Sequence, residues 1–149
     1  MGIAYAEIGL ENYLNRRRMS VRALVDSGSV FLTVPEHVAL QLGFDITEVA
    51  TCEVTLADGS RRKVPMIDPV RVTFAGRHCA LSALVMGDEP LFGAVPMEMM
   101  DLVIHPATQT LSVNPASPFK PSTLAKHLAI ARLPLADRAN RHASSSILG

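Results

Sequence analysis

Apolar residues fall along this chain in short runs, and the spacing within those runs is typical of β-strands rather than of long helices. Strands are predicted over residues 3–10, 21–26, 30–34, 70–74 and 79–86. Polar segments that contain glycine or proline follow most of these runs, as expected of turns. The pattern therefore predicts an all-β domain, and a chain of 149 residues is long enough to bury a hydrophobic core.

Two short helices are predicted between the strands. The first covers residues 34–42, because Thr33 and Glu36 form a capping-box pattern and Gly43 is a residue that commonly follows the end of a helix. The second covers residues 96–100. Neither is long enough to change the assignment of the fold to the all-β class.

Two hairpins are predicted as well. Asp58 and Gly59 lie between two extended arms, residues 53–56 and 62–66, and Asp-Gly in such a position is a strong hairpin signal. A second hairpin is predicted over residues 102–113. From these residues alone, the first could be an ordinary surface hairpin.

Candidate chemistry is concentrated where an apolar run ends in a carboxylate, in the stretch Ala-Leu-Val-Asp-Ser-Gly at residues 23–28. The strand before Asp26 is apolar on both faces, so Asp26 is expected at the mouth of a turn in the middle of the core. A lone buried carboxylate costs several kcal/mol unless a partner compensates its charge. Asp26 could instead simply cap the turn, but a second apolar run broken at Gly93 favours a functional role.

Four motifs, taken in order, resemble those of the retropepsin-like aspartic proteases, in particular the small single-domain bacterial proteins of clan AA. They are Ala-Leu-Val-Asp-Ser-Gly at 23–28, Leu-Ala-Asp-Gly-Ser at 56–60, Leu-Phe-Gly at 91–93 and a closing segment at 99–106. The resemblance covers residues 3–118. It implies a single-domain acid-protease fold, a closed and barrel-like β-structure with one or two short helices.

The resemblance also implies roles for individual residues. The catalytic turn would consist of Asp26, Ser27 and Gly28. The hairpin would be the flap that closes over a bound peptide, and the flap and pocket residues would be Leu56, Ala57, Asp58, Gly59, Ser60, Leu91, Phe92 and Gly93. Gly93 is expected to permit a close approach of the backbone beside the catalytic turn. Leu32 is a further candidate for the pocket lining. The apolar residues among these candidates could equally belong to the core.

Peptide hydrolysis by this route requires two carboxylates that share one proton at a single water molecule. The chain contains one Asp-Ser-Gly, and Asp58, Asp68 and Asp101 do not lie in a second such turn. The expectation is therefore a homodimer in which Asp26 of each copy meets the other at the two-fold axis. This predicts an aspartic endopeptidase that cleaves apolar peptides. The alternative is a protease-fold peptide-binding or assembly module with little or no turnover.

The composition limits the classes of partner and cofactor that the protein is expected to bind. Lys plus Arg and Asp plus Glu number 14 each, and this balance argues against a nucleic-acid or membrane-surface partner. Cys52 and Cys79 lack the spacing of metal ligands, so they are predicted to be free thiols, and no metal or cofactor is expected. The chain shows neither a signal-peptide pattern nor an apolar run of membrane-spanning length, which predicts a cytoplasmic location.

Two segments receive no function from the sequence. The polar segment 11–20 contains Arg16-Arg17-Arg18, which is interpreted as part of a solvated loop rather than as a patch for an anionic ligand. The domain is predicted to cover residues 1–118, with residues 119–149 as a C-terminal tail that is partly helical or disordered.

Overall fold

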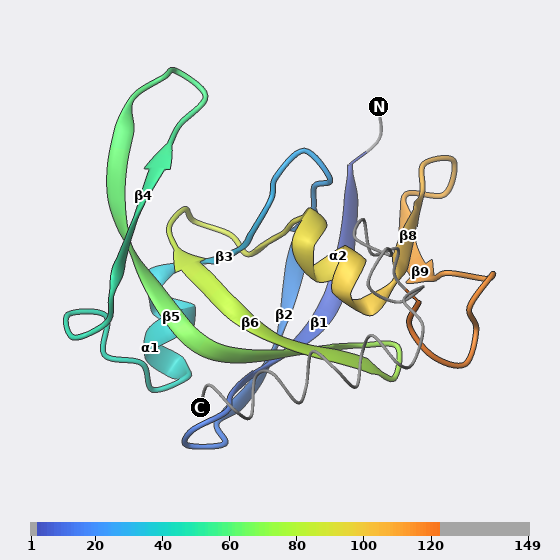
Figure 1. Cartoon of the computed structure of the whole chain (residues 1–149), viewed down its shortest axis with the longest axis horizontal. Helices are drawn as coiled ribbons and strands as arrows, with labels where there is room; N and C mark the ends of the chain where they lie inside the picture. Colours follow the sequence, from blue (N-terminus) through green and yellow to red (C-terminus); the bar gives the residue numbers. More distant parts are fainter. Residues whose placement is uncertain (1–2, 123–149) are drawn as a thin grey trace, which may run out of the picture.

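The computed structural model describes residues 3–122 of the chain, and within this range six strands close into a barrel (Figure 1). The six strands are β1 (Ala4–Asn12), β2 (Arg18–Val25), β3 (Leu32–Val34), β5 (Arg61–Phe74), β6 (Arg77–Val85) and β7 (Leu91–Phe92). Their order is β1-β2-β7-β3-β6-β5, and β1 also pairs with β5, which closes the barrel. The predicted all-β, barrel-like fold is therefore confirmed.

The core of the barrel is filled by aliphatic side chains from alternate strand positions. In β1, Ala4, Ala6 and Ile8 are buried while Tyr5 and Glu7 between them are exposed. Each large side chain that is fully buried contributes about 1.5–3 kcal/mol relative to an exposed position. The fully buried side chains include Ile8, Leu10, Leu32, Ile67, Val70, Val72 and Phe92.

The remaining elements lie outside the closed ring of strands. Strand β4 (Thr51–Thr55) pairs with the first part of β5 and forms a hairpin that projects from the barrel (Figure 1). Helix α1 (Glu36–Gln41) follows β3, and helix α2 (Ala94–Met100) follows β7. Strands β8 (Leu102–His105) and β9 (Thr110–Val113) form a separate two-stranded sheet, as the second predicted hairpin requires.

The start of the first helix differs from the prediction. Helix α1 begins at Glu36, its N-cap is Pro35, and no side chain caps it. The predicted capping residue, Thr33, is instead part of β3, where the strand pairing of its backbone prevents it from acting as a cap. The end of the helix is as predicted, because Gly43 has a φ of +83° and its N–H donates to the Leu40 carbonyl at 2.9 Å.

The polar segment 11–20 was wrongly predicted to be a loop. Strand β1 continues to Asn12 and β2 begins at Arg18, so only a tight turn separates them. The charged ends of the strands are held together by pairing between Glu11 and Arg18 across the two strands. A pattern of apolar residues does not reveal strand positions that are occupied by paired charges.

Residues 62–66 and 70–74, predicted as separate strands, form one continuous strand, β5, with a register shift between Ile67 and Val70. The first part of this strand belongs to the projecting hairpin and the second part to the wall of the barrel. The hairpin is therefore anchored directly in the barrel rather than through a loop.

A buried arginine fastens the C-terminal part of the described chain to the barrel. The Arg77 guanidinium donates to the carbonyl oxygens of Met100 and Asp101, at 2.9 and 2.8 Å, and to that of Ser117. The Asp101 carboxylate accepts hydrogen bonds from Asn114, Ser117 and Ser122, and these bonds, with that from Ser117 first, lower the pKa of Asp101.

We expect Arg77→Met to lower the free energy of unfolding by about 2 kcal/mol or more, because carbonyl groups at the end of α2 lose a charged donor. Arg62→Met, on an exposed position of β5, is the matched control and should change stability by less than about 0.5 kcal/mol. Urea unfolding followed by circular dichroism measures both. Equal stability of the two variants would contradict this role of Arg77.

Candidate active site

The turn that carries Asp26 leaves the barrel at the end of β2 and is held by backbone hydrogen bonds. The Asp26 N–H donates to the Phe92 carbonyl at 3.0 Å, and the Ser29 N–H donates to the Asp26 carbonyl at 3.1 Å. The Gly28 N–H donates to Oδ1 of Asp26 at 2.9 Å. The backbone of its own turn thus orients the carboxylate.

Strand β7 lies between β2 and β3 and brings Leu91, Phe92 and Gly93 beside the turn at Asp26. It pairs in parallel with β2, with Val25 opposite Phe92, and antiparallel with β3, with Thr33 opposite Leu91. Because β7 enters the sheet beside Val25, the chain that follows it passes directly alongside the turn at Asp26.

Gly93 makes this passage possible. A Cβ atom at Gly93 would lie 2.7 Å from the Ser29 carbonyl oxygen and closer still to that of Phe31. The φ of Gly93 is −92°, so the requirement for glycine comes from space and not from the backbone angle. After Gly93, the Ala94 N–H donates to Ser29 O at 2.7 Å and the Val95 N–H to Val30 O at 2.9 Å. The predicted close approach beside the turn is confirmed.

Asp26 is exposed in the single chain, as are Ser27 and Gly28, so the expectation that Asp26 lies in the middle of the core is wrong. The strand before it is buried, but the turn emerges at the end of the barrel, where solvent can reach the carboxylate. Two large apolar side chains beside the turn are exposed as well, Val30 at 54% and Phe31 at 46%. An apolar surface therefore adjoins the carboxylate.

The projecting hairpin has the tip that its sequence predicts. Its loop residues are Ala57, Asp58 and Gly59, and Gly59 has a φ of +84° with no atom near the position of a Cβ. Oδ1 of Asp58 accepts hydrogen bonds from the Ser60 hydroxyl at 2.5 Å and the Ser60 N–H at 2.9 Å, and these bonds lower the pKa of Asp58. Leu56, which begins the turn, is half-buried.

The hairpin and the turn at Asp26 extend toward the same end of the barrel in Figure 1. Within residues 3–122, no hydrogen bond links the hairpin tip to the turn. The predicted site residues therefore form two groups: the turn at Asp26 with Leu91 to Gly93, which are in contact, and the hairpin tip, which is separate.

A cavity of about 210 Å³ lies between the base of the hairpin and the turn. Its lining is almost entirely apolar, and it comes from Phe31 after the turn, from β3, from the base of the hairpin, from β6 and from α2. The lining residues are Phe31, Leu32, Cys52, Met66, Leu81, Ser82, Leu84 and Val95. Of the predicted pocket residues, Leu32 is among them. Leu56, Ala57 and Leu91 are not, and Phe92 is fully buried in the core.

Sequence reasoning missed Cys52, Met66 and Leu81 as cavity residues. Their positions depend on β5 continuing from the hairpin into the barrel, which the prediction of two separate strands did not include. Cys52 and Cys79 are both free, as predicted. No three residues among His, Cys, Asp and Glu lie close enough to hold a metal ion within the range 3–122, and no described helix is long and apolar enough to cross a membrane.

Comparison with solved structures identifies the fold. The retroviral protease-like domain of Ddi1 from Leishmania major superposes with a TM-score of 0.55, at 15% sequence identity, over 85% of this chain and 98% of that domain. This chain has a retropepsin-like fold. A retropepsin-like aspartic protease from Rickettsia conorii is also similar, with a TM-score of 0.50 and 19% identity over 70% of this chain and 88% of that one. The sequence matches no model of a protein family and no curated protein.

We expect Gly93→Ala to lower the free energy of unfolding by about 1–3 kcal/mol, because the added methyl group would overlap the carbonyl groups of the turn in this retropepsin-like fold. Gly59→Ala is the comparison: its position offers space, so it measures the cost of a side chain at a positive φ alone, about 1–2 kcal/mol. Urea unfolding compares the two. A Gly93→Ala protein as stable as wild type would show that the backbones do not pack this tightly.

The two thiols should react differently. Burial raises the pKa of Cys79 to about 11, whereas Cys52 is half-buried in the lining of the apolar cavity. At about pH 8, a thiol reagent should therefore label Cys52 in the native protein and Cys79 only after denaturation. Mass spectrometry counts the labels, and Cys52→Ser should leave the native protein unlabelled. Equal labelling rates at both residues would contradict the burial of Cys79.

Proposed function

We propose that the protein is an aspartic endopeptidase that acts as a homodimer and needs no metal or cofactor. The observation that carries this proposal is the exposed position and fixed orientation of the Asp26 carboxylate. This carboxylate is oriented by the Gly28 N–H and lies at the exposed end of a turn that β7 and Gly93 support. The fold itself is shared with a protein described as a retropepsin-like aspartic protease.

In this mechanism two carboxyl groups share one proton, because two negative charges only a few Å apart are unfavourable. The ionised carboxylate acts as the general base for a water molecule, and the protonated one polarises the carbonyl group of the peptide. The proton is later delivered to the leaving nitrogen. The titration belongs to the pair and not to one residue.

The second carboxylate is proposed to be Asp26 of another copy. The three aspartates considered above are engaged elsewhere: Asp58 bonds to Ser60 at the hairpin tip, Asp68 to Ser82, and Asp101 to the segment after β9. The exposed turn and the apolar side chains of Val30 and Phe31 beside it offer a surface on which a second copy could pack. Such an interface would be the same patch on both subunits.

The substrate is proposed to be a peptide or protein with large apolar side chains. The cavity of about 210 Å³ begins beside the turn, at Phe31 and Leu32, and its only polar side-chain groups are those of Cys52 and Ser82. An aliphatic or aromatic side chain of a substrate would be removed from water there, at about 25 cal/mol for each Å² of apolar surface. The hairpin would close over the substrate backbone.

The Asp26→Asn protein should remain folded and dimeric, and it should lose cleavage of an apolar peptide library by about 10³-fold or more, because the general base is removed. Asp88→Asn, an exposed aspartate in the loop before β7, is the matched control and should cleave as wild type does. Mass spectrometry of the digests gives the rates, and sedimentation velocity gives the oligomeric state.

Three results would count against the proposal. Equal cleavage by wild type and Asp26→Asn would reject the mechanism. A monomer at all concentrations would remove the second carboxylate. Peptide binding without cleavage by wild type would favour a protease-fold peptide-binding or assembly module.

A further inference from the structure

Three arginines surround one buried glutamate at the end of the barrel where β1 turns into β2. Glu11 is only 4% exposed. Its Oε2 atom lies 2.7 Å from Nε of Arg18, and its Oε1 atom lies 3.6 Å from Nη1 of both Arg16 and Arg71. The cluster joins β1 to both of its neighbours in the barrel.

The strand register produces this convergence. Glu11 is paired with Arg18 of β2 on one side and with Arg71 of β5 on the other. Gly9 lies two residues before Glu11 in β1 and is paired with Thr73, which lies two residues after Arg71 in β5. Because side chains two apart on a strand share a face, Thr73 lies on the same side of the sheet as the charged groups.

The cluster carries more positive charge than is needed to neutralise the Glu11 carboxylate. The hydrogen bond from Arg18, followed by the charges of Arg18, Arg16 and Arg71, lowers the pKa of Glu11 against the effect of its desolvation, so Glu11 is ionised at neutral pH. One carboxylate then faces three guanidinium groups, which leaves an excess of two positive charges. In the described part of the chain no other acidic residue lines this site.

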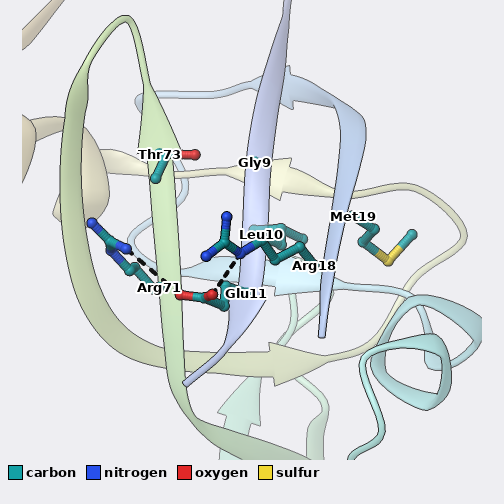
Figure 2. A pocket seen from close by; sticks show the side chains of 7 residues that line it. All are labelled: Gly9, Leu10, Glu11, Arg18, Met19, Arg71 and Thr73. Atoms are coloured by element: carbon teal, nitrogen blue, oxygen red, sulfur yellow. Dashed lines mark hydrogen bonds and ion pairs between the residues drawn. The ribbon is translucent and has the colours of Figure 1, made fainter. Parts of the chain in front are cut away.

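A small cavity of about 100 Å³ opens among these side chains. Figure 2 shows the guanidinium groups of Arg18 and Arg71 on two sides of it, the Glu11 carboxylate between them and the Thr73 hydroxyl directed toward Gly9. A Cβ atom at Gly9 would collide with that hydroxyl, so glycine keeps this wall of the cavity open. Met19 and Leu10 complete the lining.

Hydrogen-bond donors remain available around this cavity. Arg18 uses only its Nε atom on Glu11, so both terminal nitrogens are free to donate to a ligand, and the described residues provide no acceptor for the Thr73 hydroxyl. A guanidinium group has five N–H donors in a planar fork that fits the oxygens of a carboxylate or phosphate. A water molecule occupies about 30 Å³ in the liquid, so this volume suits an ion of a few heavy atoms.

We propose that Arg18, Arg71 and Thr73 form a binding site for a small oxoanion of the phosphate class, either a free ion or a phosphate group on a small molecule, with Arg16 adding positive charge at the rim. A merely solvated arginine segment accounts for Arg16, whose guanidinium also lies 4.6 Å from the ring centre of Tyr13. It does not account for Arg18 and Arg71, which come from two different strands and line the same cavity. The site is independent of the candidate active site, since Glu11 and Ala4 lie at opposite ends of β1 and Ala4 is paired with Val25, next to Asp26.

The test measures the unfolding temperature of the full chain in inorganic phosphate, and phosphate binding by isothermal titration calorimetry. The ionic strength is held constant with chloride. Phosphate should bind saturably and raise the unfolding temperature, because a ligand that binds only the folded state stabilises it. Arg18→Gln and Arg71→Gln should each weaken binding about 10-fold or more, since each removes a charged donor. Arg22→Gln, on the same strand but stacked on Tyr5 at 4.2 Å, is the matched control and should bind as wild type does.

Arg18 is 73% exposed at its side chain, so Arg18→Gln should fold even if Arg71→Gln does not. Titration with glycerol phosphate distinguishes the two sources of the ligand: comparable binding indicates that a phosphate group on a larger molecule can enter, and binding of inorganic phosphate alone indicates a free ion. The proposal is overturned if phosphate acts no differently from chloride, or if Arg18→Gln binds phosphate as tightly as wild type.

Discussion

The close contact between Gly93 and the carbonyl groups of Ser29 and Phe31 is the constraint on which the candidate site depends. It allows β7 to enter between β2 and β3, and it allows the chain after β7 to donate hydrogen bonds back to the turn. Two segments far apart in the sequence thereby hold the same short turn. The position of the Asp26 carboxylate follows from backbone packing, which is stiffer than any arrangement of exposed side chains.

Much of this fold could be predicted from the sequence because its signals are local. The alternation of buried residues in β1, the Asp58-Gly59 turn and the glycine after α1 each depend on neighbours a few positions away. The wrong predictions arise where residues distant in the sequence determine the local structure. Thr33 matches a helix cap in sequence, but β6 and β7 take it into the sheet. Arg18 lies in a polar segment that is typical of a loop, but it belongs to β2, where it pairs with Glu11 of β1.

The candidate site divides in the same way. The turn at Asp26 and its contact with Gly93 could be predicted from the sequence, because the Asp-Ser-Gly motif indicates the turn and Gly93 indicates the close contact. The apolar cavity was not, since Met66 and Leu81 meet there only after β5 and β6 pair. Nor could the sequence show that the Asp26 carboxylate is exposed in one chain, because an apolar strand before a turn does not indicate where in the barrel that turn emerges.

The continuity of β5 limits how this protein can vary. One strand serves as an arm of the hairpin and as a wall of the barrel, and the register shift between Ile67 and Val70 separates these two parts. Inserting a single residue between the hairpin tip and Val64 would displace the arm by one position and turn inward-facing groups toward solvent. Changes in the length of this hairpin should therefore fall at its tip, come in steps of two residues, or be absorbed by a register shift such as the one between Ile67 and Val70. Exchanging hairpins between such barrels requires the register of the arms to match as well as their length.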